Sequence, residues 1–215
     1  MRREENHQLD TVNRMLAGEV LYVKALGICG SARHAGNTAL LIEGVLAGAA
    51  SSGMETEQVF LNELDIGPCL GCRSCKGKTE QCATEDDFGG LIQKVRDADL
   101  VVLGSPIYMG QVTGQTKTFL DRLYSLRRAD RTIRLDGTKK KGAMVVVCGS
   151  TDPAHPDGTR RTLGVFFRYL NTPDVIELVE QGLGSEGEVL TRPESMARAR
   201  QTGQKLAGDL LRAHA

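Results

Sequence analysis

The chain has 215 residues, which is enough for one domain with a full hydrophobic core and short for two. Its 27 Lys and Arg balance its 27 Asp and Glu. This zero net charge argues against a general binder of nucleic acid or anionic membranes, because both need a basic excess. The sequence contains no run of 18 or more apolar residues, so we expect no membrane span.

Residues 1–20 look like an appended arm ahead of a single domain that spans residues 21–215. Leu9, Val12, Met15 and Leu16 recur in the arm at helical spacing. The first 21 residues lack the apolar stretch of a secretory signal. Cysteines at metal-like spacing without such a signal indicate a reducing compartment, so we expect a cytoplasmic protein.

The first element of the domain is an apolar segment, residues 20–29, which predicts a buried strand. A small polar loop over residues 30–38 follows, and then a helix over residues 39–50. A strand, a polar loop and a helix start form an arrangement that binds phosphate, because helix N–H groups and the helix dipole favour an anion. The side chains that could contribute hydrogen bonds are Ser31, Arg33, Asn37 and Thr38. The alternative is an ordinary turn in which Asn37 caps the helix.

A second strand is predicted over residues 55–61, and a cysteine-rich loop at residues 67–85 comes after it. This loop holds four of the six cysteines at the spacing C-x2-C-x2-C-x6-C, namely Cys69, Cys72, Cys75 and Cys82. Compact cysteine runs of this kind supply the four thiolates that a [4Fe–4S] cluster needs. Alternatives are a structural zinc site, an empty or redox-active thiol loop inherited from a cluster-binding ancestor, and a disulfide, which a cytosolic chain disfavours.

The remaining segments continue the alternation of strands and helices. Asp86 and Asp87 suit the start of a helix through residue 98 as capping carboxylates rather than as catalytic acids or metal ligands. Strands are predicted at 100–104, 142–148 and 173–179, and helices at 113–126, 159–170 and 192–213. Residues 127–141 form a charged connection. Five such alternations predict a doubly wound parallel sheet, in which Cys29 and Cys148 are small buried residues outside the cluster.

The loop after the third strand is a second candidate for ligand binding, because ligands of open α/β sheets bind at the carboxyl ends of the strands. Tyr108 and Met109 there offer an apolar surface for a ring, although core packing is the alternative for both. The histidines His34 and His155 lie in loops of the same kind and are expected to be exposed rather than to transfer protons.

Several of these motifs resemble those of the flavodoxin-like NAD(P)H-dependent FMN reductase family. Residues 30–38 are similar to its phosphate loop G-S-P-R-x-x-G-N-T, with Ala32 in place of proline. Residues 104–108 and 117–122 resemble its S-P-[IV]-Y and K-x-F-x-D-R patterns. The cysteine spacing resembles that of the iron–sulfur flavoproteins within this family, and the likeness covers about residues 20–185.

The resemblance implies a flavodoxin-like, doubly wound five-stranded parallel sheet with the cysteine-rich loop after its second strand. It implies FMN, with its phosphate at Ser31, Arg33, Asn37 and Thr38. The flavin ring would lie against Pro106, Ile107, Tyr108, Met109 and Gly110, with Gly149, Ser150 and Asp152 at the ring edge. Members of the family assemble as homodimers or homotetramers.

The function that we expect is electron transfer by an FMN-dependent oxidoreductase. A donor such as ferredoxin would reduce the [4Fe–4S] cluster, which would pass electrons to FMN and on to dioxygen, peroxide or a quinone. No side chain need act as a catalytic acid, base or nucleophile. The alternatives are a cluster-free NAD(P)H-dependent FMN or quinone reductase and a non-enzymatic redox or metal sensor.

Overall fold

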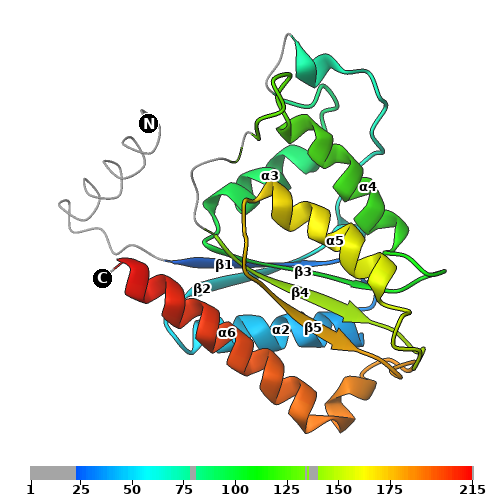
Figure 1. Cartoon of the computed structure of the whole chain (residues 1–215), viewed down its shortest axis with the longest axis vertical. Coiled ribbons are helices and arrows are strands. Elements are labelled where there is room, and N and C mark those ends of the chain that lie inside the picture. The colour runs from blue at the N-terminus through cyan, green and yellow to red at the C-terminus, as the bar shows by residue number, and fades with distance from the viewer. Residues whose placement is uncertain (1–22, 78–80, 134, 136–139, 215) are drawn as a thin grey trace.

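The computed structural model describes residues 23–77, 81–133, 135 and 140–214, so the predicted arm at residues 1–20 lies outside the described part. Five parallel strands form one sheet in the order β2-β1-β3-β4-β5 (Figure 1). The strands are β1 (Lys24–Cys29), β2 (Glu55–Phe60), β3 (Leu100–Pro106), β4 (Lys141–Val147) and β5 (Val175–Glu180). This is the strand order of the flavodoxin-like fold that the family resemblance implies.

Burial along the strands explains this order. The three central strands, β1, β3 and β4, are buried along almost their whole length, whereas β2 and β5 are only partly buried. Parallel strands need apolar side chains on both faces when helices cover both faces. The apolar sequences of β1, β3 and β4 therefore place them in the middle, and β2 and β5 form the edges.

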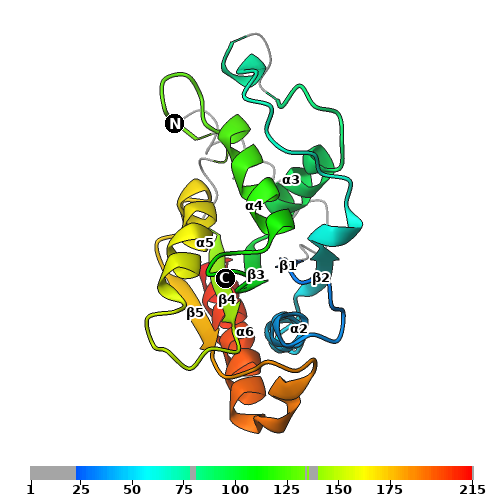
Figure 2. The ribbon, with the colours of Figure 1, turned by 90° about the vertical axis from the view of Figure 1, so that its right-hand side faces the viewer.

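Helices cover the two faces of the sheet as separate layers. One layer consists of α2 (Asn37–Ala50) and α6 (Pro193–His214), and the other of α3 (Phe88–Asp97), α4 (Gly114–Arg122) and α5 (Asp157–Tyr169) (Figures 1 and 2). Each layer has its own apolar core against the sheet. The cysteine segment projects beyond the outer ends of α3 and α4, away from the sheet.

The predicted elements are present, with shifts at their ends. The helix predicted at 113–126 ends at Arg122 and continues as a 3₁₀ turn over Leu123–Leu126. The last strand begins at Val175 rather than at Pro173, which has no N–H for a ladder hydrogen bond. Cys29 and Cys148 are buried, as predicted. Within the described residues, no helix is long and apolar enough to cross a membrane.

Candidate cofactor sites

A cavity of about 180 Å³ lies where the loops after β1, β3 and β4 meet. The order of the sheet reverses between β1 and β3, and ligands of open α/β sheets bind at such a point, beyond the carboxyl ends of the strands. The predicted residues that line this cavity are Ser31, Arg33, Asn37, Thr38, Pro106, Ile107, Tyr108 and Gly149. The fold thus brings together groups that are up to 118 residues apart in the sequence, counting from Ser31 to Gly149.

The loop after β1 leaves the start of α2 open to an anion. Gly36 is the N-cap residue of α2, no side chain among the described residues caps the helix, and its first turn carries no acidic residue. The hydroxyl of Ser31 accepts a hydrogen bond from the Arg33 N–H at 3.1 Å, which holds the loop in a tight turn. The first N–H groups of the helix therefore remain for a ligand, and together with the helix dipole they suit a phosphate.

The same loop is fixed to the N-terminus of α4. The carbonyl of Gly30 accepts hydrogen bonds from the Thr113 hydroxyl at 2.8 Å and from the Gln115 amide at 2.9 Å. A Cβ atom on Gly30 would lie 2.0 Å from the hydroxyl oxygen of Thr116, so only glycine fits there. The loop after β1 and the N-terminus of α4 therefore pack together as one unit.

Asn37 does not cap α2, so the alternative in which it acts as the N-cap is wrong. Its carboxamide donates to the Ser185 carbonyl at 2.8 Å and accepts from the Val189 N–H at 2.9 Å. These bonds fasten the segment after β5 against the start of α2. Within this segment, the Glu188 carboxylate accepts two further N–H groups, from Gly184 and Ser185.

This segment after β5 forms a fourth wall of the cavity that the sequence reasoning missed. Its cavity-lining residues are Leu183, Gly184 and Glu186. The run Gly-Leu-Gly-Ser-Glu-Gly from Gly182 to Gly187 is a signal that could have revealed it, since it is a fourth glycine-rich loop after a strand. Gly182 and Gly187 both have positive φ, at 68° and 71°. Gly36, Val147 and Cys148 also line the cavity without having been predicted.

Four of the residues predicted for the flavin lie outside the lining of this cavity, namely Met109, Gly110, Ser150 and Asp152. Tyr108 and Gln111 exchange two backbone hydrogen bonds, of 2.8 and 3.0 Å, across a two-residue turn. Both central residues have positive φ, 49° at Met109 and 77° at Gly110, as this type of turn requires. The turn leaves the Met109 side chain fully exposed.

Neither predicted loop histidine lines the cavity. The imidazole of His34 packs on Phe60, with ring centroids 4.1 Å apart, and its Nε2 lies 2.9 Å from the Glu63 carboxylate. His155 donates its backbone N–H to the Asp152 carbonyl at 3.0 Å. Both lie in loops as predicted, and His34 is exposed, whereas His155 is half-buried rather than exposed; that neither transfers protons stays a prediction.

The four cysteines of the segment after β2 line a second, much smaller hollow. Its volume is about 20 Å³, and Cys69, Cys72, Cys75 and Cys82 all contribute to its wall. No three His, Cys, Asp or Glu side chains in the described ranges are arranged as ligands of one metal ion. The thiols thus surround one space without converging on a point, and the loop would have to open to admit a cluster.

The chemistry of this hollow suits a soft, anionic group. Hydrogen bonds from Ser74, through its hydroxyl and its backbone, lower the pKa of the Cys72 thiol. Arg122 lies in the wall beside the thiols and interacts with Cys82, and its buried Nε–H meets no hydrogen-bond acceptor among the described atoms. Four thiols and an unsatisfied cationic N–H around one space fit an iron–sulfur cluster as a donor set.

Of the two acidic residues after the cysteines, Asp86 bonds to the start of α3 as predicted, whereas Asp87 occupies the N-cap position without a side-chain capping bond to any described helix N–H. Asp86 accepts the Phe88 N–H at 3.1 Å, and Asp87 accepts the Asp65 N–H at 2.8 Å. Asp86 also forms a buried ion pair with Arg122. Burial tends to raise the pKa of Asp86, but the Arg122 guanidinium and the backbone N–H groups of Gly67 and Phe88 outweigh it, so the pKa is lowered.

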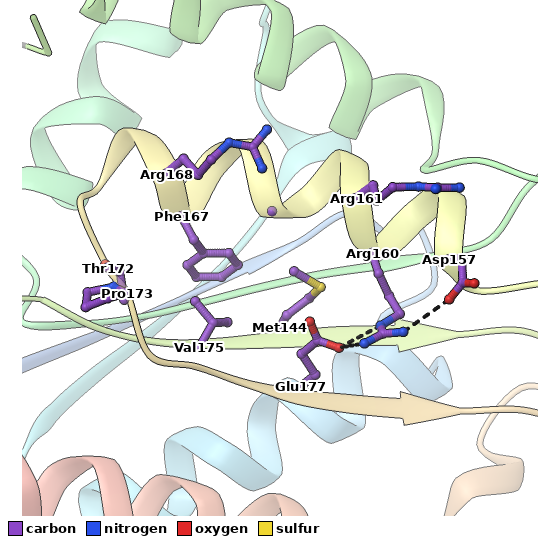
Figure 3. A pocket seen from close by; sticks show the side chains of 11 residues that line it. Met144, Asp157, Arg160, Arg161, Phe167, Arg168, Thr172, Pro173, Val175 and Glu177 are labelled. Atoms are coloured by element: carbon purple, nitrogen blue, oxygen red, sulfur yellow. Dashed lines mark hydrogen bonds and ion pairs between the residues drawn. The ribbon is translucent and has the colours of Figure 1, made fainter. Parts of the chain in front are cut away.

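A larger cavity lies away from both sites. It measures about 400 Å³ and lies between α5 and the edge strand β5, over an apolar floor of Met144, Phe167 and Val175 (Figure 3). At one end Arg160 is held by ion pairs to Glu177 and Asp157. None of the residues predicted for a cofactor lines it, so size alone does not identify the site.

Comparison with known families supports the cofactor that the first cavity suggests. The model of the family described as NADPH-dependent FMN reductase matches residues 23–180. An iron–sulfur flavoprotein of Methanocaldococcus jannaschii is 41% identical over 105 residues, a match that spans 49% of this chain and only 54% of that protein. An iron–sulfur flavoprotein of Archaeoglobus fulgidus is 34% identical over 187 residues, which span 86% of this chain and 79% of that protein.

Solved structures give the same fold. A flavone reductase superposes with a TM-score of 0.66 at 25% identity, covering 86% of this chain and 62% of its own. An NAD(P)H:quinone oxidoreductase from Methanothermobacter marburgensis gives a TM-score of 0.69 at 15% identity, covering 86% of this chain and 99% of its own. At 15% identity, the likeness to the quinone oxidoreductase shows a shared fold and nothing more.

Proposed function

Because this chain belongs to the NADPH-dependent FMN reductase family, and within it is related to the iron–sulfur flavoproteins, it is an FMN-dependent oxidoreductase, and we propose that it relays electrons from a one-electron donor such as ferredoxin to a small acceptor. The acceptor would be dioxygen, peroxide or a quinone. FMN would occupy the cavity at the strand ends, and a [4Fe–4S] cluster the four-cysteine hollow. We further propose that the protein works as a homodimer or homotetramer.

The observation that carries this proposal is the single cavity formed by the loops after β1, β3 and β4. The uncapped start of α2 would hold the phosphate of FMN, with help from Ser31, Arg33 and Thr38. Pro106, Ile107 and Tyr108 would support one side of the ring system, and Gly149 would lie at its edge. FMN, when bound, supplies electron transfer in steps of one or two electrons.

Met109, Gly110, Ser150 and Asp152 stand just beyond this wall, and we propose that they contact FMN only after their loops close over it. The turn at Met109 and Gly110 projects from the end of β3, immediately after Tyr108, which does line the cavity. The hydroxyl of Ser150 accepts the Asp152 N–H at 3.2 Å, which gives this loop a fixed shape. Met109 and Gly110 thus follow the cavity-lining Tyr108, and Ser150 and Asp152 lie within three residues after the cavity-lining Gly149.

The four thiolates of Cys69, Cys72, Cys75 and Cys82 would hold the cluster, which supplies one-electron transfer when bound. The chain's own contribution is to gather four sulfur donors at one place and to lower the thiol pKa of Cys72 through Ser74. A thiolate, rather than a thiol, is the metal ligand, so a lowered pKa favours loading at neutral pH.

Anaerobic purification with counts of iron, sulfide and FMN per chain tests the proposal. We expect about one FMN, about four iron and about four sulfide per chain, as a [4Fe–4S] cluster requires. Cys72→Ala should lose the iron and keep FMN, whereas Cys29→Ala, a buried cysteine outside the hollow, should keep both. Undiminished reduction of FMN by ferredoxin in Cys72→Ala would refute the relay.

A second candidate is a reductase without a cluster, in which NAD(P)H reduces FMN directly. It is favoured by the fact that no three metal-ligating side chains converge in the described part of the chain. Rapid anaerobic bleaching of the flavin by NADPH in iron-free protein would support it. Bleaching that requires iron-loaded protein and reduced ferredoxin would exclude it.

A further inference from the structure

The base of the cysteine loop is closed by a single guanidinium group. Arg122, at the end of α4, is only 1% exposed and has the largest side chain among the fully buried described residues. It donates to the Gly67 carbonyl at 2.9 Å and to the Thr84 carbonyl at 3.4 Å. Gly67 lies two residues before the first cysteine of the loop and Thr84 two residues after the last, so one side chain holds both stems.

Asp86 completes this clasp. Its carboxylate, 6% exposed, accepts two hydrogen bonds from Arg122, at 2.6 and 3.0 Å, and one from the Gly67 N–H at 3.0 Å. The ring of Phe88 lies against the guanidinium, 4.7 Å from its central carbon. This paired geometry fixes the direction of the guanidinium plane, since bidentate contacts to a carboxylate are geometrically specific.

One N–H of Arg122 has no partner in this arrangement. Its Nε–H is buried and reaches no described acceptor at hydrogen-bond distance, although the Cys82 thiol interacts with the guanidinium group, and a charged donor left unsatisfied in the interior is costly. Arg122 belongs to the wall of the hollow that the four cysteines line. The vacant donor therefore lies where sulfur acceptors are gathered.

We propose that Arg122 is the positioning residue of the four-cysteine site, where it clasps the loop through Asp86 and donates its Nε–H to a sulfur atom of the bound cluster. This inference rests on the proposed function, because it needs a cluster in the hollow. Hydrogen bonds to sulfur and nearby positive charge raise the reduction potential of such clusters. Arg122 supplies both, and Asp86 partly neutralises its charge.

Two substitutions with opposite expected effects test the proposal. Arg122→Lys keeps a charge but loses the planar fork and the Nε–H, so the reduction potential of the cluster should fall. Asp86→Asn keeps the shape of the clasp and removes a negative charge, so the potential should rise. We expect each to shift the reduction equilibrium about tenfold, which is about 59 mV for one electron.

The matched control is Lys117→Gln, which breaks an exposed ion pair with Asp121 on the same helix and should leave the potential unchanged. A redox titration followed by electron paramagnetic resonance gives the potentials. Shifts of opposite sign support the proposal. Equal reduction potentials in the wild type and the three variants overturn it. Shifts of the same sign in Arg122→Lys and Asp86→Asn also overturn it, because a purely structural clasp would change the potential only by loosening the loop, and both substitutions loosen it.

The clasp itself is measured separately, in protein without metal. Trypsin can cleave the loop after Arg73 and Lys76, and we expect faster cleavage in Arg122→Lys than in wild type or Lys117→Gln. Unchanged cleavage refutes the clasp. If wild-type protein takes up no iron, the proposed relay fails together with the Nε–H role, while the proteolysis result still decides whether Arg122 closes the loop.

Discussion

Replacing Asn37 should separate two roles that its position allows, contact with a ligand and attachment of the segment after β5. The side chain is 8% exposed and joins the Ser185 carbonyl to the Val189 N–H. In Asn37→Ala both bonds are lost. In Asn37→Asp a carboxylate oxygen can still accept the Val189 N–H, but no donor remains for Ser185.

The magnitude follows from what each variant leaves unpaired. Val189 is fully buried, so in Asn37→Ala its N–H loses its acceptor without access to water, at about 1–3 kcal/mol. The Ser185 carbonyl lies in an exposed residue that water can reach, so its lost bond adds only about 1 kcal/mol. The free energy of unfolding should thus fall by about 2–4 kcal/mol in Asn37→Ala and by about 1 kcal/mol in Asn37→Asp.

FMN affinity should show the reverse order. Asn37→Asp places a negative charge at the start of α2, where the phosphate is proposed to bind, so it should weaken FMN more than Asn37→Ala does. Urea unfolding of FMN-free protein, followed by circular dichroism because the chain has no tryptophan, gives the stabilities. Gln204→Ala, which removes an exposed amide 3.4 Å from the Ser51 hydroxyl, is the control. Asn37→Ala with wild-type stability would refute the reasoning.

Three further predictions concern stability. Burial lowers the pKa of Lys140 from 10.5 to about 8, so between about pH 8 and 10.5 the unfolded chain binds more protons than the folded chain. The free energy of unfolding of the wild type, relative to that of Lys140→Met, should therefore rise with pH across this window. Urea titrations at several pH values would measure this difference. Thr172→Val removes a buried hydroxyl that bonds to no described atom and lies at one end of the cavity in Figure 3. The substitution should raise the free energy of unfolding by about 1 kcal/mol. A lower free energy of unfolding would mean that this hydroxyl has a hydrogen-bond partner. Gly203→Ala would place a Cβ atom 1.9 Å from the Val45 carbonyl oxygen, where α6 crosses α2. It should lower the free energy of unfolding by about 2–3 kcal/mol and lower the melting temperature. Gly208→Ala, whose Cβ atom would have only a flexible arginine side chain within 4 Å, should leave both unchanged.

The sequence predicts the fold well because each of its central strands is a short, continuous apolar run between loop signals. Such runs satisfy the one condition of a parallel strand covered by helices on both faces. Boundaries depend on individual groups, such as the missing N–H of Pro173, and they shift by a few residues. The close crossing of α2 and α6 at Gly48 and Gly203 has no local signal, since it depends on two segments about 150 residues apart.

The candidate site could be predicted only where one loop carries its own motif. The loops after β1, β3 and β4 do so, and the structure brings them to one cavity. The wall after β5 could not be predicted because its attachment depends on the side chain of Asn37. In the sequence, Asn37 belongs to the phosphate-loop motif, which suggests contact with a ligand rather than with a distant loop. The exposure of Met109 could not be predicted, because its side-chain chemistry suggested a ring contact, whereas the turn with positive φ at residues 109 and 110 leaves the side chain exposed.

Helix α4 connects the two candidate sites and shows why its sequence contributes to both. Its N-cap, Thr113, is bonded to the loop after β1, and its last residue, Arg122, lies in the wall of the four-cysteine hollow. At 1.5 Å per residue, its nine residues span on the order of 13 Å. A helix fixed at one end to the flavin cavity and at the other to the sulfur ligands sets the separation of the two sites within a subunit.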